Sequence, residues 1–143
     1  MKSKILVFLQ FFTILLMIFP FGKEVSYPFL GTAFIVFGMG IGLLAIKTHQ
    51  QGNFNIRPDI KENCELVTHG IYAYIRHPMY LSVLVMMFGF LILYSDLYRF
   101  ILYIFLVIVL HVKLHYEESL WVCHSKEYEA YKQRTKKLIP FIY

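Results

Sequence analysis

The chain has 143 residues, of which 58% are hydrophobic and 18% aromatic, and its net charge is +5. This length argues for a single domain, residues 1–143, and the apolar fraction is above the roughly 45–50% of soluble domains. The positive charge does not indicate nucleic-acid binding, because basic cytosolic loops are expected in membrane proteins. The composition predicts an all-α integral membrane helical bundle.

Long stretches with few or no charges locate the membrane spans. A spanning helix needs about 20 apolar residues. The first three stretches, which begin at residues 5, 25 and 77, meet this length. The fourth is long enough only if Arg99 and Lys113 extend their charged ends to the two interfaces. The first stretch is expected to be a retained anchor, because no small-x-small cleavage site follows it. The four predicted spans are approximately 5–22, 25–46, 78–95 and 98–115.

The distribution of lysine and arginine predicts the orientation. Twelve of the fourteen basic residues lie at the N-terminus, in 47–76, or from Lys113 onward. Only Lys23 and Arg99 fall in the other connections. Because basic residues favour the cytosolic side, we expect a multi-pass protein with both termini in the cytosol. Cys64 and Cys123 then lie in cytosolic segments and are expected to be reduced.

The last part of the chain predicts a cytosolic helix. The stretch HYEESLWVCHSKEYEAYKQRTKK contains good helix formers and neither Pro nor Gly. We expect it to continue the fourth span out of the membrane without a break and to end at Pro140.

The third and fourth spans should form an antiparallel hairpin that brings two charged pairs together. The pair Arg76–His77 ends 18 residues before Ser95, and the pair Glu117–Glu118 begins 19 residues after Tyr98. At about 1.5 Å rise per residue, both pairs lie roughly 27 Å from the turn. Adjacent helices pack about 8–10 Å apart, so the pairs can face one another. They form either a structural ion pair or a functional site. Ionisable groups at membrane depth are candidates for function.

Two motifs carry a family resemblance. The stretch ELVTHGIYAYIRHPMYLS resembles the cofactor-binding signature of the isoprenylcysteine carboxyl methyltransferase family, and EESLWVCHSKEYEAYKQRTKKLIPFIY resembles the ending of its members. The resemblance implies an integral membrane methyltransferase that uses S-adenosylmethionine, with its cofactor region in 64–82 and 113–140. Ser82 stands where the family usually has Gly, which predicts looser helix packing there. His124-Ser125 replaces an aromatic-Gly step.

The resemblance also implies roles for individual residues. The nucleotide side of the cofactor would contact Leu66, Val67 and Tyr72, and its amino-acid end would contact His77, Pro78, Met79 and Tyr80. Glu117 or Glu118 would contact the cofactor. Lys113 stands four residues before Glu117, where eukaryotic relatives have an Arg near the substrate carboxylate. The candidate catalytic residues are Arg76, Lys113 and Glu117.

This assignment is chemically consistent. A carboxylate can offset the positive charge of a sulfonium, and Arg76 or His77 can offset the carboxylate of the cofactor. Methyl transfer is an in-line displacement, so the protein mainly positions the acceptor about 3–3.5 Å from the methyl carbon. The motifs leave the acceptor open: an isoprenylcysteine carboxylate, a phospholipid amine, or another apolar or lipid-linked thiol or acid.

Other interpretations remain. His111 and His115, with Glu118 one turn on, could bind a metal, although a polar stripe on the helix is the simpler explanation and we expect no metal. The GMGIG sequence at 38–42 indicates close helix packing. An NADPH-dependent membrane reductase of the sterol-reductase type shares a related RHPxY region. A non-enzymatic membrane scaffold, with the basic tail KQRTKK on anionic lipid, is a further alternative.

Overall fold

The computed structural model describes residues 2–48, 66–140 and 142–143, and in these ranges the chain is helical. The elements, in chain order, are α1 (Lys2–Ile18), α2 (Pro28–Thr48), the 3-10 helix η1 (Gly70–Ala73), α3 (Pro78–Tyr94), α4 (Leu97–His124) and α5 (Lys126–Arg134). Over the described residues there is no strand, only an isolated bridge between Ile75 and Lys136. The predicted all-α class is confirmed.

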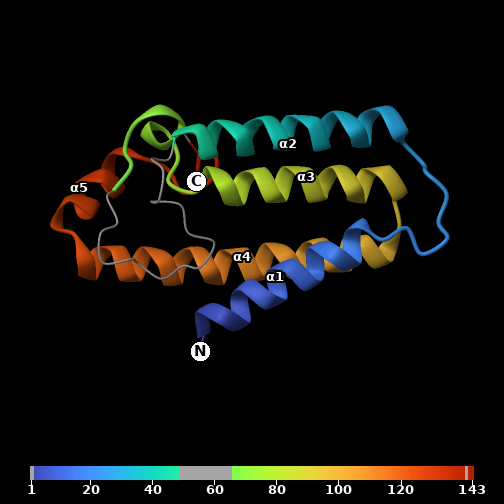
Figure 1. Ribbon diagram of the computed structural model, residues 1–143, viewed down its shortest axis with the longest axis horizontal. Helices are drawn as coiled ribbons and strands as arrows, with labels where there is room; N and C mark the ends of the chain where they lie inside the picture. The colour runs from blue at the N-terminus through green and yellow to red at the C-terminus, as the bar shows by residue number, and fades with distance from the viewer. Residues whose placement is uncertain (1, 49–65, 141) are drawn as a thin grey trace.

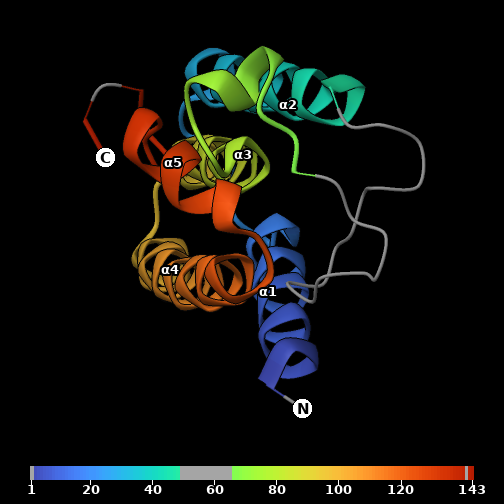
Figure 2. The ribbon, with the colours of Figure 1, turned by 90° about the vertical axis from the view of Figure 1, so that its left-hand side faces the viewer.

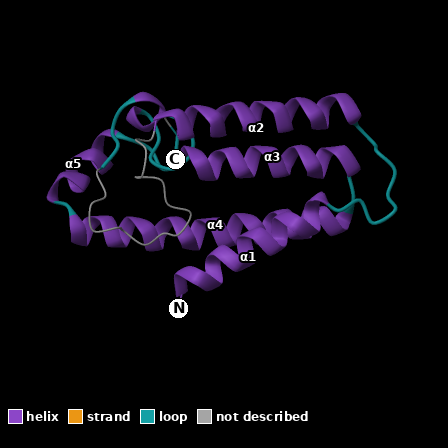
Figure 3. Ribbon diagram, viewed as in Figure 1, coloured by secondary structure: helices purple, strands orange, loops and turns teal. Residues whose placement is uncertain are grey.

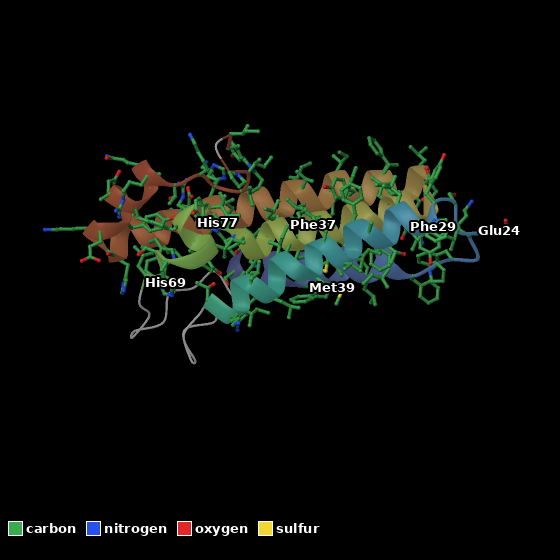
Figure 4. The ribbon with its side chains drawn as sticks, turned by 90° about the horizontal axis from the view of Figure 1, so that it is seen from above. Glu24, Phe29, Phe37, Met39, His69 and His77 are labelled. Atoms are coloured by element: carbon green, nitrogen blue, oxygen red, sulfur yellow. The ribbon has the colours of Figure 1, made fainter. Side chains whose placement is uncertain are left out.

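The long helices form one bundle (Figure 1). Helices α2 and α3 run side by side, and α4 returns alongside α3. Helix α1 packs mainly against α4, which it crosses at an angle. Short connections join α3 to α4 at one end of the bundle and α4 to α5 at the other end (Figure 3). In Figure 4, His77 and Glu24 lie at opposite ends of the bundle. The Arg76–His77 pair is therefore well separated from the connection between α1 and α2.

Two helices of the described chain, α2 and α4, are long and apolar enough to cross a membrane. Helix α3 is equally apolar in character but has 17 residues, at the lower limit of span length. Many large apolar side chains of α1 and α2 are exposed, including Phe8, Phe29 and Phe37. This outward-facing apolar surface suits a lipid environment. The four-span topology and the cytosolic termini remain predictions.

Glycines bring α2 and α3 into close contact, as the GMGIG sequence predicts. A Cβ on Gly89 would lie 2.7 Å from the carbonyl oxygen of Gly31, and a Cβ on Gly38 would lie 2.8 Å from the nitrogen of Met86. Ser82 donates a hydrogen bond to the carbonyl of Gly38 at 2.8 Å and is buried. The expectation that Ser82 loosens this interface is therefore wrong, because its hydroxyl satisfies a helix carbonyl inside it.

The expected extension of Arg99 and Lys113 to the interfaces is also wrong. The exposed fractions of the two residues are 0% and 1%. Arg99 donates from Nε to the carbonyl of Met17 at 3.0 Å and from Nη2 to that of Phe19 at 2.6 Å, and it pairs with Asp96. The guanidinium thus satisfies carbonyls at the C-terminal end of α1, which have no partner within the helix.

Helix α1 ends at Ile18, four residues before the predicted end at residue 22. Pro20 stands two residues later and has no backbone N–H to continue the helix. Phe21 and Gly22 then adopt positive φ values of 45° and 70°, which turn the chain toward α2. The other predicted spans begin or end within about three residues of helix ends, except that α4 continues to His124.

The predicted unbroken helix from the fourth span to Pro140 is wrong. Ser125 has extended backbone angles (φ −137°, ψ 125°), and its side chain caps α5 by accepting from the N–H of Glu127. Helix α5 then folds back across the end of the bundle (Figure 2). This reversal buries Tyr128 and Tyr131, with exposed fractions of 2% and 3%. A continuous helix would leave both rings in solvent.

Candidate functional site

The two charged motifs meet at one end of the bundle, as the hairpin geometry predicts. Pro78 occupies the first turn of α3, where its missing N–H costs nothing. This places Arg76 and His77 just before the helix and Tyr80 on its first turn. Arg76 Nε donates to Glu118 Oε1 at 2.7 Å, and the Tyr80 hydroxyl donates to Glu117 Oε2 at 2.6 Å. Both carboxylates therefore contact the RHPMY motif.

Arg76 is engaged within the protein. It is 8% exposed and pairs with Glu118, whose side chain is 7% exposed. Its Nη1 also donates to the carbonyl oxygens of Lys132 and Thr135, at 3.1 and 2.5 Å. These carbonyls lie at the C-terminal end of α5, where the helix dipole favours a cation. Arg76 thus joins α3, α4 and α5 into one unit.

The backbone strengthens this connection. The N–H groups of Arg76 and His77 donate to the carbonyls of Lys136 and Lys137, at 2.8 and 3.0 Å. The N–H of Lys136 donates to the carbonyl of Tyr74 at 3.1 Å. The segment after α5 therefore pairs with the residues that carry the charged motif.

Glu117 is more accessible than Glu118. Its side chain is 27% exposed, and His77 Nδ1 lies 3.9 Å from its Oε2. His77 Nε2 lies 3.4 Å from Glu118 Oε1, so the imidazole stands between the two carboxylates. The rings of His77 and Tyr80 are parallel, with centroids 5.3 Å apart. Glu117 is the acidic group of this cluster that a ligand can reach, whereas the charge of Glu118 is offset by Arg76.

An apolar wall adjoins the acidic group. Val67 and Tyr72 are buried against Ala45 of α2, with Ile71 and Met79 packed on them. Leu66 is half-buried and Pro78 is fully buried. The structure thus places the predicted nucleotide-side residues and the predicted amino-acid-end residues next to one another. Residues 64 and 65 of the predicted region lie outside the described residues.

Tyrosines from η1 and α5 complete the surroundings. The Tyr131 hydroxyl donates to the carbonyl of Tyr72 at 2.7 Å. Burial raises the pKa of Tyr72, Tyr128 and Tyr131, so each hydroxyl keeps its proton at neutral pH. Among the described residues, the buried Tyr128 hydroxyl has no hydrogen-bond partner. A buried hydroxyl without a partner is costly, which makes Tyr128 a candidate ligand contact.

Lys113 lies next to the cluster but turns toward α1. Its Nζ donates to Gln10 Oε1 at 2.7 Å and lies 5.0 Å from the centre of the Tyr80 ring. Gln10 is not among the predicted site residues, although an amide inside the uncharged stretch of the first helix is a usable signal. Tyr128, Tyr131 and Thr135 are not among them either, because their contribution depends on the reversal of α5.

Over the residues that the structure describes, no group of three or more His, Cys, Asp or Glu side chains could hold a metal ion. The Nδ1 of His115 lies 2.8 Å from the backbone carbonyl oxygen of His111, so a hydrogen bond within the helix already occupies this nitrogen. Cys123 is a free, exposed thiol, and Cys64 lies outside the described residues.

The cluster combines a reachable carboxylate, an imidazole, a phenol donor and an apolar wall. This arrangement suits a ligand with a cationic centre and a flat apolar part. A family model described as phospholipid methyltransferase matches residues 26–128. The match contains α2, η1, α3 and α4 with both charged pairs, and it confirms the relationship that the two motifs indicate. No curated protein matches the chain.

Proposed function

Because the chain belongs to the phospholipid methyltransferase family, we propose that it is an S-adenosylmethionine-dependent membrane methyltransferase acting on an apolar or lipid-linked acceptor. The observation that carries the proposal is the meeting of the RHPMY and Glu-Glu motifs through the Tyr80–Glu117 and Arg76–Glu118 contacts. Family membership favours this function over the reductase and the scaffold that the sequence left open.

The residues present fit S-adenosylmethionine. The carboxylate of Glu117 can offset its positive charge, and the buried Tyr128 hydroxyl can donate to or accept from a polar group of the ligand. Val67, Tyr72 and Met79 offer an apolar surface for the nucleoside. When bound, the cofactor supplies an electrophilic methyl group on a sulfonium, so neither a metal nor a covalent nucleophile is required.

Glu117 is the better candidate for the cofactor contact. Glu118 is buried and already paired with Arg76, so its charge is largely cancelled. Glu117 keeps a partly exposed carboxylate, which the Tyr80 hydroxyl orients. Arg76 and Glu118 then act as positioning residues that hold His77 and α5 in place.

The acceptor's own chemistry completes the reaction. S-adenosylmethionine held by Glu117 and the apolar wall would supply a methyl group to the acceptor and would leave as S-adenosylhomocysteine. A primary or secondary amine acceptor must also release a proton, whereas a carboxylate or thiolate acceptor does not. If the acceptor is an anion, exclusion of water by the apolar wall favours the neutralisation of charge during methyl transfer.

Cofactor binding gives the first test. Isothermal titration in detergent should show binding of S-adenosylhomocysteine and no binding of NADPH. The Glu117→Gln variant should bind at least tenfold more weakly to S-adenosylmethionine, because a hydrogen bond or contact to a charged group contributes about 1.5–3 kcal/mol. Glu129→Gln, which neutralises an exposed acid on α5, is the matched control.

Activity gives the second test. Lipid extracts incubated with the protein and labelled S-adenosylmethionine should yield a methylated product that mass spectrometry can identify. The Arg76→Ala and Glu117→Ala variants should each lose this activity. Full turnover in both variants, or binding of NADPH alone, would reject the site and the function.

A further inference from the structure

An apolar groove runs along the outer face of α3, next to the candidate site but without its residues. Its volume is about 280 Å³, close to the lower limit of small-molecule pockets at roughly 300 Å³. The face of α3 from Leu81 to Phe88 forms one wall, with Phe34 of α2 and Tyr103 of α4 on either side. The C-terminal residues after α5, hereafter the tail, close the groove at Leu138 and Tyr143. This size suits part of one acyl chain rather than a whole lipid.

Three basic side chains lie where the tail closes the groove. The ring of His111 stacks on Tyr143 with centroids 6.2 Å apart, and Lys137 Nζ lies 5.2 Å from the centre of the same ring. Lys137 Nζ also lies 3.0 Å from Nε2 of His115. Because Tyr143 lines the groove, this cluster of His111, His115 and Lys137 stands at its end.

The hydrogen bonds define the charge of this cluster. The ammonium of Lys137 can only donate, so Nε2 of His115 must accept from it. The proton of His115 then lies on Nδ1, which donates to the carbonyl of His111 at 2.8 Å. Among the described residues, His115 uses one of the three N–H groups of Lys137, and two remain for a ligand. The cluster offers a cation next to a membrane-facing groove.

We propose that the groove and the basic cluster form a binding site for an anionic glycerophospholipid. One acyl chain lies along α3 between Leu81 and Phe88, and the phosphate contacts Lys137 and His111. Charge complementarity selects this occupant, because basic residues next to a membrane helix bind anionic headgroups. An uncharged lipid or a second helix would leave the ammonium of Lys137 without a counter-charge.

This lipid site differs from the proposed methyl-donor site. Glu117 and Tyr80 do not line the groove, so a lipid can bind without a cofactor. The sites still share one segment, since the carbonyl of Lys137 accepts from the N–H of His77 at 3.0 Å. A lipid phosphate on Lys137 thus stabilises the segment that is hydrogen-bonded to the charged motif.

Lipid retention tests the proposal without any cofactor. The protein is taken from nanodiscs of mixed phosphatidylglycerol and phosphatidylcholine into detergent, and the lipids it retains are counted by native mass spectrometry. Wild type should retain phosphatidylglycerol in preference to phosphatidylcholine. Lys137→Gln should lower this retention about fivefold, the factor that corresponds to the roughly 1 kcal/mol of one lysine near anionic lipid. Phosphatidylglycerol with a photoreactive acyl chain should crosslink to α3.

Lys136→Gln is the matched control, because it removes the same charge from the neighbouring residue, whose side chain is exposed. This variant should retain phosphatidylglycerol as wild type does. Lys137→Arg keeps the cation and should also retain it, which separates loss of charge from misfolding. Equal retention by Lys137→Gln and wild type would overturn the proposal. Equal loss in both Gln variants, or crosslinks that avoid residues 81–88, would also overturn it.

Discussion

Replacing Arg76 by Met tests whether the charged motif organises the end of the bundle. The substitution keeps an unbranched apolar side chain but removes the guanidinium. In the native structure this group donates to Glu118 on α4 and to the carbonyls of Lys132 and Thr135 at the end of α5. The variant leaves a buried carboxylate without its ion-pair partner and releases the end of α5.

The structure sets the magnitude of this effect. Both partners are at least 92% buried, with exposed fractions of 8% for Arg76 and 6% for Glu118. Breaking a buried ion pair by removing one partner costs about 3–5 kcal/mol. The carbonyls of Lys132 and Thr135 add little to this free-energy cost if α5 undocks, since water then solvates them. We therefore expect Arg76→Met to lower the free energy of unfolding by at least about 3 kcal/mol.

Chemical unfolding in detergent, followed by circular dichroism, measures this loss. Limited proteolysis between His124 and Arg134 measures the undocking of α5 and should proceed faster in the variant. Lys132→Met removes an exposed charge but keeps its carbonyl, so it should change stability by no more than about 0.5 kcal/mol. The double variant Arg76→Met, Glu118→Leu should regain much of the loss, because it leaves no unpaired charge. A single variant with wild-type unfolding and proteolysis would refute the structural role of Arg76.

Three further substitutions test the packing of the bundle, and the same unfolding measurement gives the effect of each. Gly89→Ala should destabilise the protein by about 1–3 kcal/mol through overpacking, because its new Cβ would lie 2.7 Å from the carbonyl oxygen of Gly31. Gly40→Ala, with nothing within 4 Å of its new Cβ, should be neutral or stabilising; equal effects would contradict the close packing of α2 and α3. Arg99→Met should lower stability by about 3 kcal/mol or more, because it removes the ion-pair partner of Asp96 and leaves the carbonyls of Met17 and Phe19 without their donor. Unchanged stability of this variant would show that α1 docks without the guanidinium.

The sequence by itself determined the helical class and the meeting of the two motifs. Uncharged stretches of span length specify helices, because a buried backbone must satisfy its own hydrogen bonds. The equal distances of His77 and Glu117 from the turn then fix their common level, since helix rise is constant. The glycines at 38 and 42 likewise indicated close packing before the partner helix was known.

Tertiary structure decided which charged side chains form hydrogen bonds inside the bundle. Arg99 and Lys113 were expected at the interfaces, but they are buried against α1, where Met17, Phe19 and Gln10 supply acceptors. A sequence shows that a charge lies near a helix end, but not whether a neighbouring helix offers it a partner. Burial is favourable only when that partner is present.

The path of the last helix was also decided by tertiary contacts. Local propensity favours one helix from the fourth span onward, but docking of α5 buries Tyr128 and Tyr131 and gives its terminal carbonyls to Arg76. The hydrogen bonds that dock α5 involve Arg76 and Tyr72, which lie more than 50 positions earlier in the chain, so local helix preference could not reveal the break at Ser125. The same reversal brings Tyr128 to the candidate site and gives Arg76 two carbonyl acceptors, while its pairing with Glu118 leaves Glu117 as the accessible carboxylate.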